Sequence, residues 1–320
     1  MKVLTRDLWF ESCKGNEKIY VKIIEPEDRT LAKAVVQIAH GMAEHSMLYL
    51  DFANYLASNG YAVAINDHLG HGKSVSSGGA YGYFGKGGAQ NMVIDMHKLY
   101  AIMREEYPEI PYFLLGHSMG SFLARSYSVQ YGEELSGAIY LGTGAGPGKN
   151  LLTLQLRIAD YIVKKKGPMA HDALFEKFST ERFNKAFSPN RTGSDWLSRD
   201  KKEVDQYERD PLCGFPLTAS GYRDILKLQP QINSPSWYQA LPDIPILMVS
   251  GDKDPLGDFG KGIKKIAREL KRTGHHVQVI LYPQARHVVL CETNKEQVYH
   301  DIHQFLEEVL VEKQRKKQIK

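Results

Sequence analysis

Cysteine is scarce in this sequence of 320 residues, which contains only three. They are Cys13, Cys213 and Cys291. Because their number is odd and no CxxC pair occurs, we exclude a disulfide framework and expect reduced thiols.

Long hydrophobic runs are also absent, since none approaches the ~18 apolar residues of a membrane span. The first residues carry charges throughout and lack the apolar region of a secretory signal. The expected location is therefore the cytoplasm.

A strong excess of one charge sign is missing as well. Lys and Arg together number 41 and Asp and Glu 37, which gives a net charge of +4. Five of the positive residues lie within residues 313–320, so the rest of the chain is close to neutral. This argues against a nucleic-acid-binding face on the fold. We interpret the basic tail as a solvated helix end, with a weak attraction to anionic membrane left open.

Short apolar segments alternate with longer segments of helical periodicity through most of the chain. A hairpin is expected first, with strands at 7–13 and 18–24. Further strands are expected at 34–41, 61–67, 110–116, 137–142, 244–251 and 277–283, and helices at 48–59, 88–106, 119–131, 258–273 and from about 294. This alternation predicts an α/β fold, with a mostly parallel central sheet covered by helices on both faces.

The alternation stops between residues 145 and 240, where the chain is charged, irregular and without a clear buried strand. We interpret this segment as a helical cap inserted between two strands of one sheet. The domain prediction is a core formed by 1–144 and 241–320, with a cap at 145–240. An expected helix at 151–166 has one narrow polar stripe and is otherwise apolar. We favour packing of this helix over the site, and contact of part of its face with lipid is the alternative.

A candidate nucleophile lies where an expected strand meets an expected helix. Residues 116–120 read Gly-His-Ser-Met-Gly, a G-x-S-x-G pattern centred on Ser118. Such a tight turn raises the serine hydroxyl above the sheet edge, and the flanking glycines permit the crowded backbone. The alternative is that Ser118 only caps the helix. The context favours the nucleophile.

A serine needs a base, and the base needs an acid that orients it. In the α/β-hydrolase order the acid follows a late strand and the histidine follows the last one. Asp252 and Asp254 both follow the strand at 244–251, and we prefer Asp254 because it is deeper in the loop and precedes Pro255. His287 is the only histidine in the expected loop after the last strand.

Two backbone N–H groups are candidates for an oxyanion hole. One belongs to Met119, directly after the serine, and the other to Met42, in the loop after the strand at 34–41.

Cofactor and metal motifs are not found in the sequence. Pro147 stands where a G-x-G-x-x-G pattern needs glycine, the glycine-rich loop at 78–88 contains no G-K-[ST], and H-E-x-x-H does not occur. His68, His71 and the pair Glu44-His45 lack metal-ligand spacing with a third ligand in view. We therefore expect no cofactor and no metal.

Five motifs together are similar to those of a known family. They read HGMAEHSMLY at 40–49, NDHLGHGKS at 66–74, GHSMGS at 116–121, SGDKDPLG at 250–257 and YPQARHVVLCET at 282–293. The chain resembles the monoacylglycerol lipase and lysophospholipase group of α/β-hydrolases, which is classed with the serine aminopeptidase S33 hydrolases. The motifs span almost the whole chain except the expected insertion.

The resemblance implies roles for matching positions. It implies that Ser118 is the nucleophile, Asp254 the acid and His287 the base. It also implies that Met42 and Met119 are the oxyanion donors and that residues 145–240 form a cap. Two positions depart from the pattern. Met42 stands where such chains often have a small residue, and Val288 where they often have an acidic one.

The expected protein is thus a serine hydrolase that acts on a small acyl ester, such as a monoacylglycerol or a lysophospholipid. Three alternatives stay open. A peptidase or amidase would need an acid for the α-amine, such as Asp195, Asp200 or Asp205. An acyltransferase would use an acceptor other than water. A non-catalytic binding module is the third, although such modules usually lose a triad member.

Overall fold

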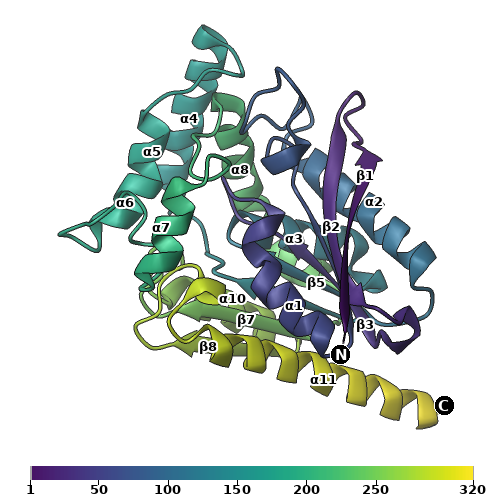
Figure 1. Cartoon of the computed structure of the whole chain (residues 1–320). Coiled ribbons are helices and arrows are strands. Elements are labelled where there is room, and N and C mark those ends of the chain that lie inside the picture. Colours follow the sequence, from purple (N-terminus) through teal and green to yellow (C-terminus); the bar gives the residue numbers. More distant parts are fainter. Residues whose placement is uncertain (1, 320) are drawn as a thin grey trace.

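One eight-stranded sheet organises the computed structural model, which describes residues 2–319 (Figure 1). The strand order is β1-β2-β4-β3-β5-β6-β7-β8. Strands β3 to β8 run parallel to one another, whereas β2 pairs antiparallel with both β1 and β4. The strands are β1 Val3–Glu11, β2 Lys18–Pro26, β3 Ala34–Ala39, β4 Tyr61–Asn66, β5 Tyr112–His117, β6 Gly137–Leu141, β7 Ile246–Gly251 and β8 Val277–Tyr282. Parallel strands place their following loops at one edge of the sheet, where the candidate residues are expected.

Helices cover both faces of the sheet, so the central strands are buried on both sides. On one face α1 (Leu50–Ser58) and α11 (Lys295–Ile319) pack through residues such as Phe52 and Phe305. On the other face lie α2 (Ala89–Glu106), α3 (Met119–Tyr131) and α10 (Lys261–Arg272), with Met96 and Leu123 in their core. The predicted α/β fold is confirmed.

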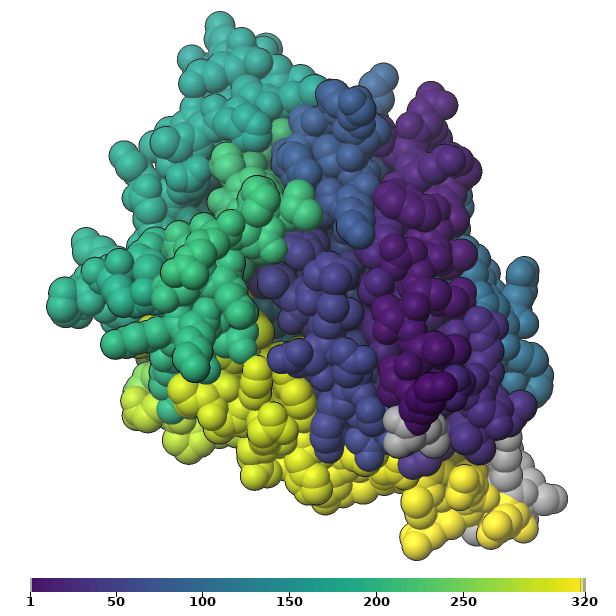
Figure 2. Space-filling view, viewed as in Figure 1, coloured from purple at the N-terminus to yellow at the C-terminus, as the bar shows by residue number. Residues whose placement is uncertain are grey.

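Six helices occupy the segment between β6 and β7. They are α4 Lys149–Lys166, α5 Leu174–Phe178, α6 Thr180–Lys185, α7 Lys201–Arg209, α8 Ala219–Ile232 and α9 Pro235–Ala240. Figure 1 shows α4 to α8 grouped beyond one edge of the sheet, and Figure 2 shows this segment as a continuous block of the surface. We call residues 145–240 the insertion. Within the described residues it contains no strand.

The expected elements lie within a few residues of those observed, and the helix predicted at 119–131 has the same bounds as α3. The helix predicted at 48–59 begins as a 3-10 turn at Ser46–Tyr49 before α1. The basic tail continues α11 as far as Ile319, and Lys320 lies outside the described residues. No helix among residues 2–319 is long and apolar enough to cross a membrane.

Candidate active site

Ser118 holds an unusual backbone conformation at the turn from β5 into α3. Its φ is +52°, a backbone angle that residues other than glycine rarely adopt. Neighbouring glycines make the turn possible: a Cβ on Gly120 would lie 2.0 Å from the carbonyl oxygen of Ala39. The N–H of Ser118 donates to the carbonyl of Leu141 at 2.9 Å, which ties the turn to the end of β6. The strained residue is therefore held rigidly at the loop edge of the sheet.

The structure brings Asp254 to His287 across two neighbouring loops. Nδ1 of His287 lies 3.0 Å from Oδ1 of Asp254, and both side chains are buried. Asp254 also accepts hydrogen bonds from the Ser250 hydroxyl at 3.1 Å and the Leu256 N–H at 2.9 Å. Asp252, the alternative acid, instead accepts from the N–H of Gln284 at 2.8 Å and so closes a turn.

One cavity of about 720 Å³ connects the candidate residues. Ser118, Met119, Met42 and His287 all line it, although they come from loops far apart in the sequence. Nε2 of His287 is buried and has no hydrogen-bond partner among residues 2–319. Because Nδ1 faces Asp254, Nε2 is the nitrogen left for chemistry in the cavity.

The two candidate oxyanion donors are not used elsewhere. Within residues 2–319, no hydrogen bond is donated by the backbone N–H of Met42 or of Met119. Met119 is the first residue of α3, whose N-terminus adds a positive dipole end next to Ser118. Both groups are thus free to stabilise negative charge in the cavity.

A buried carboxylate supports the loop after β3, and the sequence analysis missed it. Oε2 of Glu44 accepts from the Gly41 N–H at 2.9 Å and from the Tyr49 hydroxyl at 2.8 Å. The same Tyr49 oxygen lies 2.8 Å from Nδ1 of His117, the residue before Ser118. Burial raises the pKa of Glu44, but the charge of His117 and hydrogen bonds from His117 and Tyr49 outweigh it and lower the pKa to about 2. Glu44 is therefore ionised and holds the turn that carries Met42.

The histidines early in the chain serve the structure of this loop. Nδ1–H of His40 donates to the Gly41 carbonyl at 2.7 Å, and Nε2 accepts from the His68 N–H at 2.9 Å. That arrangement requires a neutral ring, and burial lowers the pKa of His40 to about 4. His40 therefore joins the loops after β3 and β4.

The insertion contacts the candidate base directly. The Trp196 ring stacks on the His287 ring with centroids 4.7 Å apart, and the Val288 N–H donates to the Leu197 carbonyl at 2.8 Å. The carboxylate of Glu292 accepts from the Arg286 N–H at 2.8 Å and from Nε of Arg199 at 2.8 Å. Apart from the Arg286–Glu292 hydrogen bond, these contacts join segments about 90 residues apart, so local sequence patterns could not reveal them.

The sheet order, with Ser118 after β5, Asp254 after β7 and His287 after β8, defines the α/β-hydrolase class. The chain belongs to the serine aminopeptidase S33 family, because the family model matches residues 30–294. Relatives include a monoacylglycerol lipase of Mycolicibacterium smegmatis, 27% identical over 90% of this chain and 92% of that protein. The human monoglyceride lipase is 27% identical over 86% and 82%.

Solved structures show the same likeness at the level of the whole fold. A thermostable carboxyl esterase from Bacillus coagulans, determined in complex with glycerol, is 31% identical and has a TM-score of 0.89. The match covers 96% of this chain and 99% of the esterase. The likeness therefore extends over the insertion as well as the core.

Proposed function

We propose that this protein hydrolyses carboxylic esters of single acyl chains, such as monoacylglycerols or lysophospholipids, through an acyl-enzyme on Ser118. The observation that carries the proposal is the buried Asp254–His287 pair, because His287 lines the same cavity as Ser118. The likeness to a carboxyl esterase and to monoacylglycerol lipases supports an ester as the substrate.

In the proposed mechanism, Nε2 of His287 removes the Ser118 proton and the oxygen attacks the acyl carbonyl. The N–H groups of Met42 and Met119 stabilise the tetrahedral oxyanion, each by ~3–4 kcal/mol. His287 then gives its proton to the leaving alcohol. Water, activated by His287, releases the acid from Ser118. Asp254 keeps the imidazole in the correct tautomer and stabilises its protonated form.

The cavity suits one acyl chain. Its volume of about 720 Å³ is within the range of small-molecule sites. Much of its wall is apolar and comes from the insertion, including Leu151, Phe175, Phe178, Phe183 and Leu226. We therefore propose that residues 145–240 act as a cap on a core formed by 1–144 and 241–320. Met42 also lines the cavity, and we propose that its side chain limits the space for the acyl group.

A peptidase on the same fold is the second candidate, because the family description names an aminopeptidase. Three acids of the insertion that could hold an α-amine are engaged elsewhere. Asp195 accepts from the Thr192 hydroxyl at 2.6 Å, Asp200 accepts from the Lys202 N–H at 2.9 Å, and Asp205 pairs with Arg191. None of these three lines the cavity, which favours the ester; the carboxylates that do line it are Glu44, Glu176, Glu208 and Asp258.

A substrate panel separates the two candidates. We expect p-nitrophenyl acyl esters, monoacylglycerols and lysophospholipids to be turned over, and aminoacyl anilides to react at least about tenfold more slowly in kcat/KM, because Asp195, Asp200 and Asp205 do not reach the cavity. Faster turnover of the anilides would contradict the ester proposal. Product analysis with added alcohols tests whether an acceptor other than water takes the acyl group.

We further propose that α4 contacts a lipid surface. Leu154 and Tyr161 lie seven residues apart, on one side of this helix, and are 51% and 63% exposed. Lys164, Lys165 and Lys166 follow in its last turn. An exposed apolar face next to basic residues favours an anionic bilayer surface.

Vesicle sedimentation tests this contact. We expect Leu154→Ser to weaken binding to anionic phospholipid vesicles by at least about tenfold, because a buried leucine contributes about 1.5 kcal/mol or more. Val311→Ser, which changes a similarly exposed residue on α11, is the matched control and should leave binding unchanged. Equal loss in both variants, or no binding by the unmodified chain, would contradict the proposal.

A further inference from the structure

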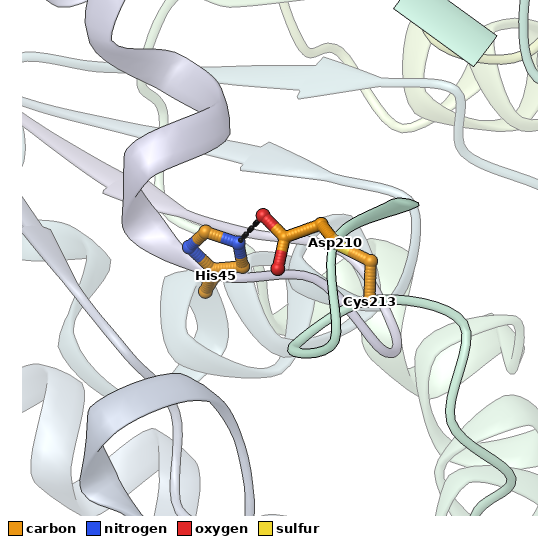
Figure 3. A group of neighbouring side chains, drawn as sticks. All are labelled: His45, Asp210 and Cys213. Atoms are coloured by element: carbon orange, nitrogen blue, oxygen red, sulfur yellow. Dashed lines mark hydrogen bonds and ion pairs between the residues drawn. The ribbon is translucent and has the colours of Figure 1, made fainter. Parts of the chain in front are cut away.

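Outside the proposed catalytic residues, a histidine, an aspartate and a cysteine meet where the core contacts the insertion. His45 lies in the loop after β3, and Asp210 and Cys213 lie in the loop after α7. Their ligand atoms all lie within 4.8 Å of one another. Figure 3 shows the Asp210 carboxylate directed at the His45 ring, with Cys213 on the same turn of chain. Nε2 of His45 and Oδ2 of Asp210 are 3.0 Å apart.

The local backbone presents these atoms together. The other carboxylate oxygen of Asp210 accepts from the Leu212 N–H at 2.9 Å, so Oδ2 is the oxygen that faces His45. The Cys213 N–H donates to the Asp210 carbonyl at 3.0 Å, which closes the turn and places the thiol beside the carboxylate. The His45 side chain is 6% exposed, Asp210 is 29% exposed, and Cys213 is partly buried. The site is thus sheltered but reachable.

From this donor set we propose that His45, Asp210 and Cys213 bind a borderline divalent ion, with Zn²⁺ as the best fit. Sulfur and imidazole nitrogen exclude the hard ions Ca²⁺ and Mg²⁺, which prefer oxygen. Three protein ligands of N, O and S type leave a fourth tetrahedral position for water.

Binding requires two changes at the ligands. The Cys213 thiol must lose its proton, because the thiolate is the form that binds metal ions. As the sulfur–zinc bond forms, the S–H bond breaks and its proton passes to solvent. Nε2 of His45 must present a lone pair, so the ring proton shifts to Nδ1. Thiolate, carboxylate and Zn²⁺ then sum to zero charge, which suits a partly buried site.

Because of where the site lies, a bound ion would also affect the structure around the cavity. The Gly214 N–H donates to the Ala43 carbonyl at 3.0 Å, directly beside the cluster. Ala43 has a φ of +52° and follows Met42, one of the proposed oxyanion donors. A bound ion would therefore fasten the insertion to the loop that carries Met42. The pair Glu44-His45 showed no third ligand in the sequence because Asp210 lies 165 residues away from His45.

Cobalt spectroscopy on the full chain tests the proposal. After treatment with a chelator and a reductant, we expect Co²⁺ to bind one to one. Binding should produce a near-ultraviolet thiolate-to-cobalt charge-transfer band and the intense visible bands of a four-coordinate ion. Zn²⁺ should displace the cobalt and remove these bands. Cys213→Ser should abolish the charge-transfer band and weaken binding by more than about 100-fold, beyond the loss of an outer-shell partner.

Two further variants keep the test decisive. Asp210→Asn preserves the side-chain shape and is used if Cys213→Ser does not fold by circular dichroism. Zn²⁺ should raise the thermal unfolding midpoint of the unmodified chain but not of Asp210→Asn. Cys13→Ser, which removes another partly buried thiol, is the control and should keep the band. Absence of the band in the unmodified chain, its survival in Cys213→Ser, or its loss in Cys13→Ser would overturn the proposal.

Discussion

Ser118 shows how single residues in this protein are constrained by backbone geometry as well as by chemistry. A Cβ on Gly116 would lie 2.3 Å from the carbonyl oxygen of Gly120, and one on Gly120 would strike Ala39. Both positions therefore require glycine, which explains the G-x-S-x-G pattern in physical terms. The cost of the positive φ at Ser118 is about 1–3 kcal/mol, offset by the packing around it.

At the residue scale, replacing Asp254 tests the proposed acid. Asp254→Asn keeps the side-chain shape but removes the charge that orients the His287 ring, so we expect kcat to fall by about 10⁴-fold. The measurement is steady-state hydrolysis of a p-nitrophenyl ester. Asp252→Asn is the matched control, because Asp252 only accepts a backbone hydrogen bond from Gln284, and it should retain most of the activity. Similar loss in both variants would contradict the assignment.

Glu44 is the second residue with a specific expectation. Glu44→Gln removes the negative charge that accepts hydrogen bonds from Gly41 and Tyr49. The turn that carries Met42 would then shift, and we expect kcat to fall by ~100-fold with a smaller change in KM. Ester kinetics check this. If KM rises by about 100-fold instead and kcat stays unchanged, Glu44 does not position the proposed oxyanion donor.

At the element scale, the insertion forms part of the site because it packs on the loop after β8. The Arg286 guanidinium donates to the carbonyls of Asp195 and Ser198, and Trp196 stacks on His287. The proposed cap therefore fixes the orientation of the proposed base in addition to lining the cavity.

Removing the stacked indole tests this contribution. We expect Trp196→Ala to lower kcat by about tenfold, because an aromatic pair contributes up to about 1.5 kcal/mol and the His287 ring would lose that restraint. Trp9→Ala on β1 is the control. The Trp9 ring contacts Tyr20 and does not line the cavity, so this variant should leave kcat unchanged. The comparison is made by ester kinetics on both folded variants. Unchanged kcat in Trp196→Ala would contradict a positioning role.

The elements themselves were the most predictable part of the molecule, because they depend on local periodicity. α3 has its predicted bounds, and the antiparallel start and parallel remainder of the sheet follow from short and long connections. The pattern around Ser118 also predicted its turn. The sequence could not predict the contacts of Trp196 with His287 or of Glu44 with His117. Those pairs are brought together only by tertiary packing, and no local spacing of residues predicts such contacts.

At the scale of the whole molecule, buried histidines link stability to pH. Burial lowers the pKa of His40 to about 4 and of His71 to about 3, and it also lowers the pKa of His68. Unfolded histidine titrates near 6.5, so below that pH the unfolded chain binds protons that the folded chain refuses. The free energy of unfolding should therefore fall as pH falls from about 6.5 to about 4, by ~1.4 kcal/mol per unit for each such histidine.

Urea unfolding at about pH 7 and about pH 5 measures this slope. His71→Gln should reduce the slope by the contribution of one histidine, whereas the exposed His276→Gln should not. Glu44, with a pKa near 2, contributes mainly below about pH 4.5, which lies outside the measured interval from about pH 7 to about pH 5. An unchanged slope in His71→Gln would show that the ring is protonated in the folded protein.

The central claim is that Ser118 is the catalytic nucleophile of this protein. Labelling with a fluorophosphonate probe, followed by mass spectrometry of the digested protein, tests it most directly. We predict a single modified peptide that contains Ser118, no label in Ser118→Ala, and much slower labelling in His287→Ala. Label on any other residue, or persistent label in Ser118→Ala, would contradict the account.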